Sequence, residues 1–229
     1  MTTLARAEQT HGTSGAAIYQ LVARVLAARH SGGGTVVDVG CGRGELYAYI
    51  KDRFGSYAGT DVLRYDGFPD GAAFHLTDLD SGRVALPDAA ADCVVAVETI
   101  EHLENPRAFA RELVRLVKPG GWVAVTTPNQ LSLLSLMTLL VLGEFNGFRE
   151  RPGLYPAHIT ALLEIDLRRI FRECGLVDVA VEYTQSGRIP GTRWHWPKWA
   201  SRLLPRRLSD NVLVVGRRPA AAGKVEGSR

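Results

Sequence analysis

The sequence has little cysteine and no long apolar run, and both shortages narrow its class. Its 229 residues include three cysteines, Cys41, Cys93 and Cys174, which lie far apart and form no Cys-x-x-Cys pair. A zinc ribbon and a disulfide framework are therefore not expected. We expect the protein to lie in a reducing, cytoplasmic compartment. The longest apolar run, Leu131 to Leu142, falls short of the roughly 20 residues that a membrane span needs.

The sequence also has no large excess of charge of either sign. The formal net charge is +3, with 22% charged and 46% hydrophobic residues, which is the ordinary balance of a globular protein. With so mild a charge, we do not expect a nucleic-acid partner. The length fits a single α/β domain over residues 1–218, followed by a flexible tail at 219–229.

Short apolar stretches alternate with helical patterns along the chain, which predicts a parallel sheet with helices on both faces. Asn105 and Pro106 are typical of a helix start, as N-cap and first helical residue. Residues 130–158 interrupt the alternation and are expected to form an inserted helical lid. The expected strands are 35–40, 57–61, 72–76, 91–97, 122–126, 177–183 and 211–216, and the expected helices are 16–30, 44–54, 108–117 and 159–174.

Three glycines, Gly40, Gly42 and Gly44, stand between the first strand and the first helix of this pattern. A dinucleotide-binding loop reads G-x-G-x-x-G, and its last glycine would fall on Glu45. An acid there would repel a pyrophosphate, so a nicotinamide dehydrogenase is disfavoured. The loop suits a ligand that carries no phosphate.

Acidic residues follow the next two strands. Asp61 ends the second strand, where a carboxylate can accept hydrogen bonds from both hydroxyls of a ribose. Asp78 follows the third strand and can accept from an adenine amino group, with Leu79 packing on the ring. Either acid alone would more simply be read as a turn residue, but their order along one sheet edge favours a nucleoside ligand.

The stretches VVDVGCGRGE, GTDV, TDLDSG, ADCVVAVETIEHLENP and LVKPGGWVAVTTPN, taken in order, resemble the motifs of class I S-adenosylmethionine (SAM)-dependent methyltransferases. The resemblance implies a Rossmann-like, doubly wound, mostly parallel seven-stranded sheet whose last strand is antiparallel. It implies SAM as cofactor, with Asp61 on the ribose and Asp78 and Leu79 on the adenine. The methionine part of SAM would lie against Asp38, Gly40, Gly42 and Gly44.

The segment VETIEHLENP carries Glu98, Glu101 and His102, which share one face if the segment makes a helical turn. Mixed oxygen and nitrogen ligands suit Mg²⁺, Mn²⁺, Fe²⁺ or Zn²⁺, and His158 is the best candidate for a fourth ligand. The E-x-x-E-H set resembles ubiquinone-biosynthesis O-methyltransferases most closely, and also small-RNA 3′-end 2′-O-methyltransferases. Two alternatives stay open: metal-free acid–base catalysis by Glu101 and His102, and a purely structural role.

The resemblance implies methyl transfer, and we expect a hydroxyl oxygen of a small, partly apolar molecule as acceptor. The alternatives are RNA 3′-end 2′-O-methylation and a SAM-binding protein without catalysis. Residues 131–142 are apolar on every side, so we expect them to be buried as a lid over the acceptor, with peripheral membrane contact or an oligomer contact as second choices. Trp194, Trp196 and Trp199 are expected to anchor their loop to the core, with a flat substrate or a lipid interface as alternatives.

Overall fold

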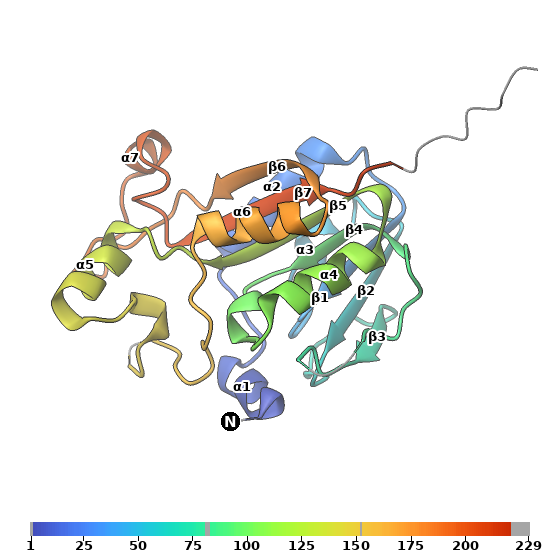
Figure 1. Ribbon diagram of the computed structural model, residues 1–229, viewed down its shortest axis with the longest axis horizontal. Coiled ribbons are helices and arrows are strands. Elements are labelled where there is room, and N and C mark those ends of the chain that lie inside the picture. The colour runs from blue at the N-terminus through green and yellow to red at the C-terminus, as the bar shows by residue number, and fades with distance from the viewer. Residues whose placement is uncertain (1, 81–82, 152, 221–229) are drawn as a thin grey trace, which may run out of the picture.

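The computed structural model describes residues 2–80, 83–151 and 153–220, and its centre is one seven-stranded sheet (Figure 1). The strands are β1 (Thr35–Val39), β2 (Ser56–Asp61), β3 (Ala73–Leu76), β4 (Ala91–Ala96), β5 (Val117–Pro128), β6 (Val177–Tyr183) and β7 (Asn211–Arg217). The helices are α1 (Thr3–Thr10), α2 (Ala16–Arg29), α3 (Tyr47–Ile50), α4 (Pro106–Leu116), α5 (Leu133–Leu142), α6 (Glu164–Glu173) and α7 (Lys198–Leu203), with 3₁₀ turns η1 (Ile100–His102) and η2 (Asn146–Phe148).

The strand order β3-β2-β1-β4-β5-β7-β6 confirms the predicted Rossmann-like, mostly parallel sheet. β1 to β5 pair in parallel, and β7 runs antiparallel to both β5 and β6. β1 lies between β2 and β4. From β1 the chain adds β2 and β3 on one side, and it then crosses to add β4 and β5 on the other side. The residues that follow β1 and β4 therefore meet at a switch point, where open α/β sheets bind their ligands.

Hydrophobic residues fill both faces of the sheet, which explains why its strands read as continuous apolar runs. Val36 packs with α2 on one face, and its neighbour Val37 packs with α4 and α6 on the other. Both valines are almost completely buried, at 0% and 1% exposure. The sequence therefore predicts two helical layers from the strands alone, because successive strand side chains point to opposite faces.

Helix α4 begins as the sequence predicts. Asn105 Oδ1 accepts a hydrogen bond from the Ala108 amide at 2.9 Å, and Pro106 is the first helical residue. The following strand is longer than predicted, because β5 starts at Val117 rather than at Trp122. The helix predicted at 44–54 is shorter, with only Tyr47–Ile50 in α-helical conformation.

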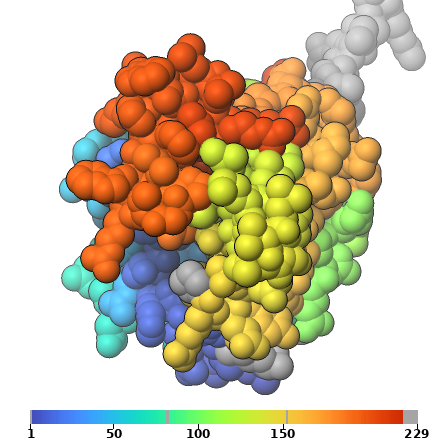
Figure 2. Space-filling view, turned by 90° about the vertical axis from the view of Figure 1, so that its left-hand side faces the viewer, coloured from blue at the N-terminus to red at the C-terminus, as the bar shows by residue number. Residues whose placement is uncertain are grey.

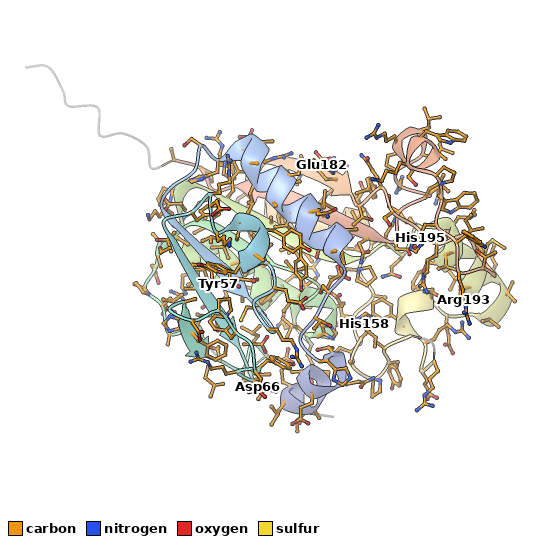
Figure 3. The ribbon with its side chains drawn as sticks, turned by 180° about the vertical axis from the view of Figure 1, so that it is seen from behind. Tyr57, Asp66, His158, Glu182, Arg193 and His195 are labelled. Atoms are coloured by element: carbon orange, nitrogen blue, oxygen red, sulfur yellow. The ribbon has the colours of Figure 1, made fainter. Side chains whose placement is uncertain are left out.

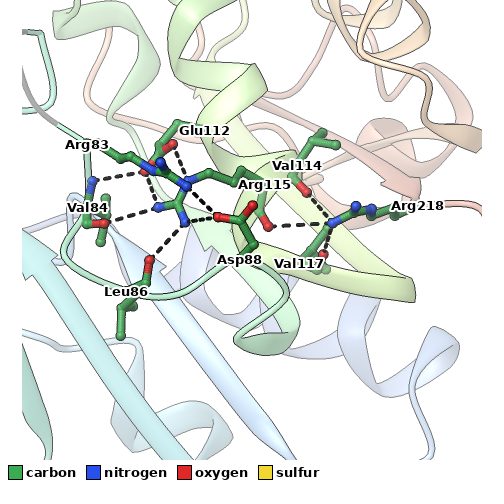
Figure 4. Close-up of polar contacts among 9 residues, drawn as sticks. All are labelled: Arg83, Val84, Leu86, Asp88, Glu112, Val114, Arg115, Val117 and Arg218. Atoms are coloured by element: carbon green, nitrogen blue, oxygen red, sulfur yellow. Dashed lines mark hydrogen bonds and ion pairs between the residues drawn. The ribbon is translucent and has the colours of Figure 1, made fainter.

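Two arginines attach the surroundings of α4 to the sheet (Figure 4). Arg115 donates to the carbonyls of Leu86 at 2.8 Å and Val84 at 3.1 Å, so it fixes the segment that leads into β4. Arg218 donates to the carbonyls of Val114 at 3.0 Å and Val117 at 2.7 Å, just after β7 ends. Arg218 thus satisfies backbone oxygens at the end of α4, where the helix leaves carbonyls without intrahelical partners, whereas Arg115 ties α4 to the segment before β4.

The segment predicted as a lid departs from expectation. α5 was expected to be buried, but Leu140 is 85% exposed and Val141 is 76% exposed. That prediction is wrong for the outer side of the helix, where Met137, Leu140, Val141 and Leu142 are exposed, and its fully buried positions are Ser135 and Thr138. α5 lies beside the segment that carries α7, at the end of the molecule seen in Figure 2. No helix among the described residues is long and apolar enough to cross a membrane.

The tryptophan loop also differs from its predicted arrangement. Trp194 is 76% exposed and Trp199 is 68% exposed, so neither side chain anchors the loop in the core. The loop is instead held through its backbone, where Arg188 and His195 form an isolated bridge and the Trp196 amide donates to the Gly187 carbonyl at 2.9 Å. Of the predicted flexible tail at 219–229, residues 221–229 lie outside the described residues.

Candidate functional site

A cavity of about 280 Å³ lies at the switch point, against the residues that follow β1 and β4. Of the residues predicted to bind SAM, Asp38, Gly40, Gly42, Asp61 and Leu79 line it. The predicted methyl-transfer residues Glu98, His102 and His158 line it as well. The structure thus brings the glycine loop and the segment after β4 around one space, although they are remote in sequence.

Two positions of the glycine loop, Gly40 and Gly42, have no room for a side chain and have a backbone conformation that favours glycine. Gly40 has φ +76°, and a Cβ there would lie 2.3 Å from Thr99 Cγ2, in the segment after β4. Gly42 has φ +51°, and a Cβ there would lie 2.3 Å from the carbonyl oxygen of Gly12. Both positions combine left-handed backbone with a close neighbour, so they tolerate only glycine. Gly44 packs against Pro69 and Phe68 instead of lining the cavity.

Asp38, at the end of β1, is 2% exposed and has a polar partner on the neighbouring strand. The Tyr57 hydroxyl donates a 2.7 Å hydrogen bond to Asp38 Oδ2. Burial raises the pKa of Asp38 to about 7, against the lowering effect of this hydrogen bond. The carboxyl group is therefore balanced between its two protonation states near neutral pH. Tyr57 belongs to no recognisable sequence motif. The only signal for its inward side chain is the alternation of inward and outward positions along β2.

The two acids predicted to hold the nucleoside differ in position. Asp61 lines the cavity, and its two oxygens accept from the amides of Gly42 at 2.8 Å and Val62 at 2.7 Å. It therefore shapes the glycine loop as well as facing the cavity. Asp78 is outside the cavity lining, and its Oδ1 accepts from the Asp80 amide at 3.1 Å.

Helix α1 closes one side of the cavity, which the sequence reading did not anticipate. Thr3, Arg6 and Thr10 all line the cavity, and Arg6 is buried and paired with Asp80. The Tyr65 hydroxyl also donates to the Ala7 carbonyl, which fastens the helix over the glycine loop. The available signal was Thr2, whose side chain caps α1 by accepting from the Ala5 amide at 3.3 Å.

The residues after β4 do not form the single helical face expected of them. Glu98 has φ +49°, so the chain reverses its twist there before η1 begins. The Glu98 side chain turns to Asn211, whose Nδ2 donates to Oε2 at 2.8 Å. The Glu98 carboxylate is thus held by β7, and Glu98 is not part of the group that Glu101, His102 and His158 form.

Glu101, His102 and His158 do come together. One ligand atom from each lies within 4.8 Å of the others, and the two imidazole rings have centroids 4.6 Å apart. His158 Nε2 lies 4.0 Å from Glu101 Oε1. The segment that brings His158 here is fixed by the Glu101 carbonyl, which accepts from the amides of Ile159 and Thr160 at 3.0 Å each. Figure 3 shows His158 near the middle of the molecule, where it is buried, and the exposed His195 nearer the end that carries α5 and α7.

Both histidines are arranged as neutral rings with a lone pair on Nε2. His102 Nδ1 lies 2.9 Å from the Ala157 carbonyl, and His158 Nδ1 lies 2.9 Å from the Gly147 carbonyl. A carbonyl oxygen only accepts, so each Nδ1 must carry the hydrogen. Burial lowers the pKa of His102, and burial together with His102 lowers that of His158 to about 3. Such backbone contacts orient imidazoles that ligate metals.

Glu101 is the least satisfied group of the site. It is completely buried, and neither carboxylate oxygen has a hydrogen-bond partner among the described residues. Burial, and then the charge of nearby Glu98, raise the pKa of Glu101 well above its usual range. An isolated carboxylate in such surroundings either keeps a proton or requires a cation beside it. The residues present therefore fit a divalent cation, with one oxygen and two nitrogens available to it.

Comparison with known proteins identifies the family. Residues 10–181 match the profile of the methyltransferase domain family. The chain belongs to the SAM-dependent methyltransferases. It is 30% identical, over 169 residues, to a probable SAM-dependent methyltransferase of Mycolicibacterium smegmatis, a match that covers 66% of this chain and 64% of that protein.

A second relative of this methyltransferase is the ubiquinone biosynthesis O-methyltransferase of Pseudomonas paraeruginosa. The two are 35% identical over 107 residues, covering 43% of this chain and 46% of the relative. The chain thus spans about half to two thirds of the length of the curated relatives it matches. The crystal structure of a SAM-dependent methyltransferase from Archaeoglobus fulgidus shares the fold, with a TM-score of 0.62, 20% identity and coverage of 92% of this chain and 97% of that one.

Proposed function

We propose that this methyltransferase moves the methyl group of SAM to a hydroxyl oxygen of a small, partly apolar acceptor. The observation that carries the proposal is the position of Glu101, His102 and His158, which gather beside the cavity that the glycine loop opens into. A hydroxyl is a weak nucleophile until it loses its proton, and this cluster offers the groups that promote that loss. A neutral amine acceptor would not need them.

Within this proposal, the glycine loop and Asp38 bind the methionine part of SAM. Asp38 faces the cavity as a buried carboxylate, suited to an ammonium group. Gly40 and Gly42 leave room for the ligand to approach the backbone. Asp61 receives the ribose, and Leu79 packs on the adenine, because both line the cavity. Asp78, which was predicted to hold the adenine amino group, lies outside this lining.

Glu101, His102 and His158 hold a divalent cation, with Glu98 outside the set. When bound, such a cation lowers the pKa of a hydroxyl that it coordinates. Glu101 supplies the negative charge that attracts it, and the two neutral imidazoles present Nε2 lone pairs. Leu103 and Leu154 line the same cavity and supply apolar surface for the body of the acceptor.

The test uses methyl-labelled SAM with a set of phenols and the matching anilines. We expect label in the phenols, loss of transfer after exhaustive chelation, and its return with added Mg²⁺, Mn²⁺, Fe²⁺ or Zn²⁺. Preferential labelling of anilines would refute the hydroxyl acceptor. Full activity after chelation, with no response to added cations, would refute the metal and leave Glu101 and His102 as acid–base groups.

A further inference from the structure

The two fully buried residues of helix α5 are polar, and four of its apolar residues are exposed. Ser135 and Thr138 are its buried residues, and Ser135 Oγ accepts from the Asn146 amide at 3.3 Å. The outward side carries Met137, Leu140, Val141 and Leu142, which are 44% to 85% exposed. A helix on the surface of a globular protein normally buries its apolar residues and exposes its polar ones. The outer side of α5 is therefore suited to an apolar environment.

A second exposed apolar group lies next to α5. Trp194, Trp199, Leu203 and Leu204 are 58% to 76% exposed and come from the loop before α7, from α7 and from its end. The two segments are joined by the Leu133 amide, which donates to the Arg207 carbonyl at 2.7 Å, and by Arg207 Nη1, which donates to the Leu131 carbonyl at 3.0 Å. Figure 2 shows both segments on one side of the molecule. We call these eight apolar residues the α5–α7 face.

The segment from Arg193 to Arg207 adds positive charge to this face. It contains five exposed cations and no acidic residue: Arg193, Lys198, Arg202, Arg206 and Arg207. Arg206 pairs with Glu164 at 3.4 Å, but among the described residues Arg193, Lys198 and Arg202 form no ion pair. α5 alone has no charged residue, so only the folded chain places cations beside its leucines.

We propose that the α5–α7 face docks on the surface of an anionic lipid bilayer. Exposed leucines and tryptophans enter the boundary between headgroups and acyl chains, and lysines and arginines next to them bind the anionic headgroups. The ten residues of α5 are too few to span a bilayer, so the helix lies in the membrane plane. A second copy of this chain fits less well, because two such faces would bring like charges together.

Docking would place the candidate site close to the membrane. The chain runs from α5 through η2, where the Gly147 carbonyl accepts from His158 Nδ1 and Phe148 lies 5.3 Å, ring to ring, from His158. η2 follows α5 in the chain and contacts His158, so it connects the α5–α7 face to the candidate site. The inference does not depend on which acceptor the site methylates.

The experiment is sedimentation of the full chain with vesicles of neutral phosphatidylcholine alone or mixed with anionic phosphatidylglycerol. We expect binding to the anionic vesicles, weakened by salt, with a blue shift of tryptophan emission. Leu140→Glu with Val141→Glu, and separately Lys198→Glu with Arg202→Glu, should each lower the partition coefficient by about tenfold or more. All four side chains are exposed, so these variants should fold and bind SAM normally.

Leu76→Glu is the matched control, because Leu76 is 70% exposed but lies on β3, at the opposite edge of the sheet from β6. It should bind anionic vesicles like the unaltered chain. Equal binding to neutral and anionic vesicles would overturn the proposal, as would unchanged binding of the α5 variant. A dimer in solution that the α5 variant dissociates, without vesicle binding, would assign the face to a second copy instead.

Discussion

The Tyr57 hydroxyl and the Asp38 carboxylate share a buried 2.7 Å hydrogen bond that joins β2 to β1 beneath the cavity. Asp38 lines the cavity, whereas Tyr57 acts through Asp38 and is not itself part of the lining. By donating to the carboxylate, Tyr57 favours its ionised form, while burial opposes ionisation. The protonation of Asp38 near neutral pH depends on this balance.

Replacing Tyr57 with phenylalanine should make SAM binding more sensitive to pH. The pKa of Asp38, about 7 in the intact protein, should rise when the donor is lost, so less carboxylate is ionised at pH 7. If Asp38 binds the SAM ammonium, affinity should increase with pH through this pKa, and Tyr57→Phe should move the midpoint to higher pH. Calorimetric titration with SAM from pH 6 to pH 9 measures it. Tyr49→Phe, at a 40% exposed tyrosine, is the control, and coincident profiles would contradict the role of Tyr57.

Glu101→Gln and His158→Ala should separate methyl transfer from SAM binding. Neither residue is predicted to touch SAM, and both belong to the cluster that promotes deprotonation, so transfer should fall by about a hundredfold or more while the Kd for SAM is unchanged. The bound metal, measured by elemental analysis, should fall with it. His195→Ala alters an exposed histidine outside the cluster and should retain full activity. Near-normal transfer by Glu101→Gln would exclude a catalytic role for the cluster.

Gly40→Ala should be far more damaging than Gly67→Ala. Both glycines have positive φ, +76° and +87°, so alanine costs about 1 kcal/mol of backbone strain at either position. Only at Gly40 would the new methyl group also meet Thr99, at 2.3 Å. We expect Gly67→Ala to keep SAM binding and Gly40→Ala to lose stability and SAM binding together. Equal melting temperatures for the two variants would show that the Thr99 contact yields without cost.

Arg115→Ala should destabilise the fold, whereas Arg83→Ala should not. The Arg115 side chain is 14% exposed and satisfies the Val84 and Leu86 carbonyls, so its loss should cost about 2 to 4 kcal/mol of unfolding free energy. Arg83 pairs with Asp88 in solvent, with 64% of its side chain exposed, and such a pair contributes little. Urea denaturation followed by circular dichroism compares them. A cost at Arg83 equal to that at Arg115 would refute this distinction.

The parts of the site that the sequence predicted are those determined by local backbone chemistry. Gly40 and Gly42 predicted a glycine loop, which the structure shows in left-handed conformation. Asn105 and Pro106 predicted the start of α4. The mostly parallel sheet was predicted from the alternation of strands and helices, and its seven strands with an antiparallel last strand from the resemblance to the methyltransferases. The glycine loop and the start of α4 each depend on a few neighbouring residues, whereas the sheet was predicted from the pattern of the whole chain.

The parts that the sequence reading missed depend on contacts between distant segments. Glu98 left the expected helical face because its backbone is left-handed and its side chain binds Asn211 on β7, which no local pattern reveals. The burial of α5 was predicted from its apolar composition, but its buried residues are Ser135, which accepts from the Asn146 amide, and Thr138, which donates to the Leu134 carbonyl within the helix. Arg6 reaches the cavity through an ion pair with Asp80, far along the chain.

The position of β7 between β5 and β6 constrains how the protein can assemble during synthesis. β6 leaves the ribosome before β7 does, yet among the described strands it pairs with β7 alone. The five parallel strands and the loops that follow β1 and β4 can therefore form early, while β6 waits without a partner. β6 can join the sheet only when Asn211–Arg217 is available, because β7 is the strand that pairs with both β5 and β6. Asn211 then also delivers the amide that binds Glu98, so the candidate site reaches its final arrangement in the same late step.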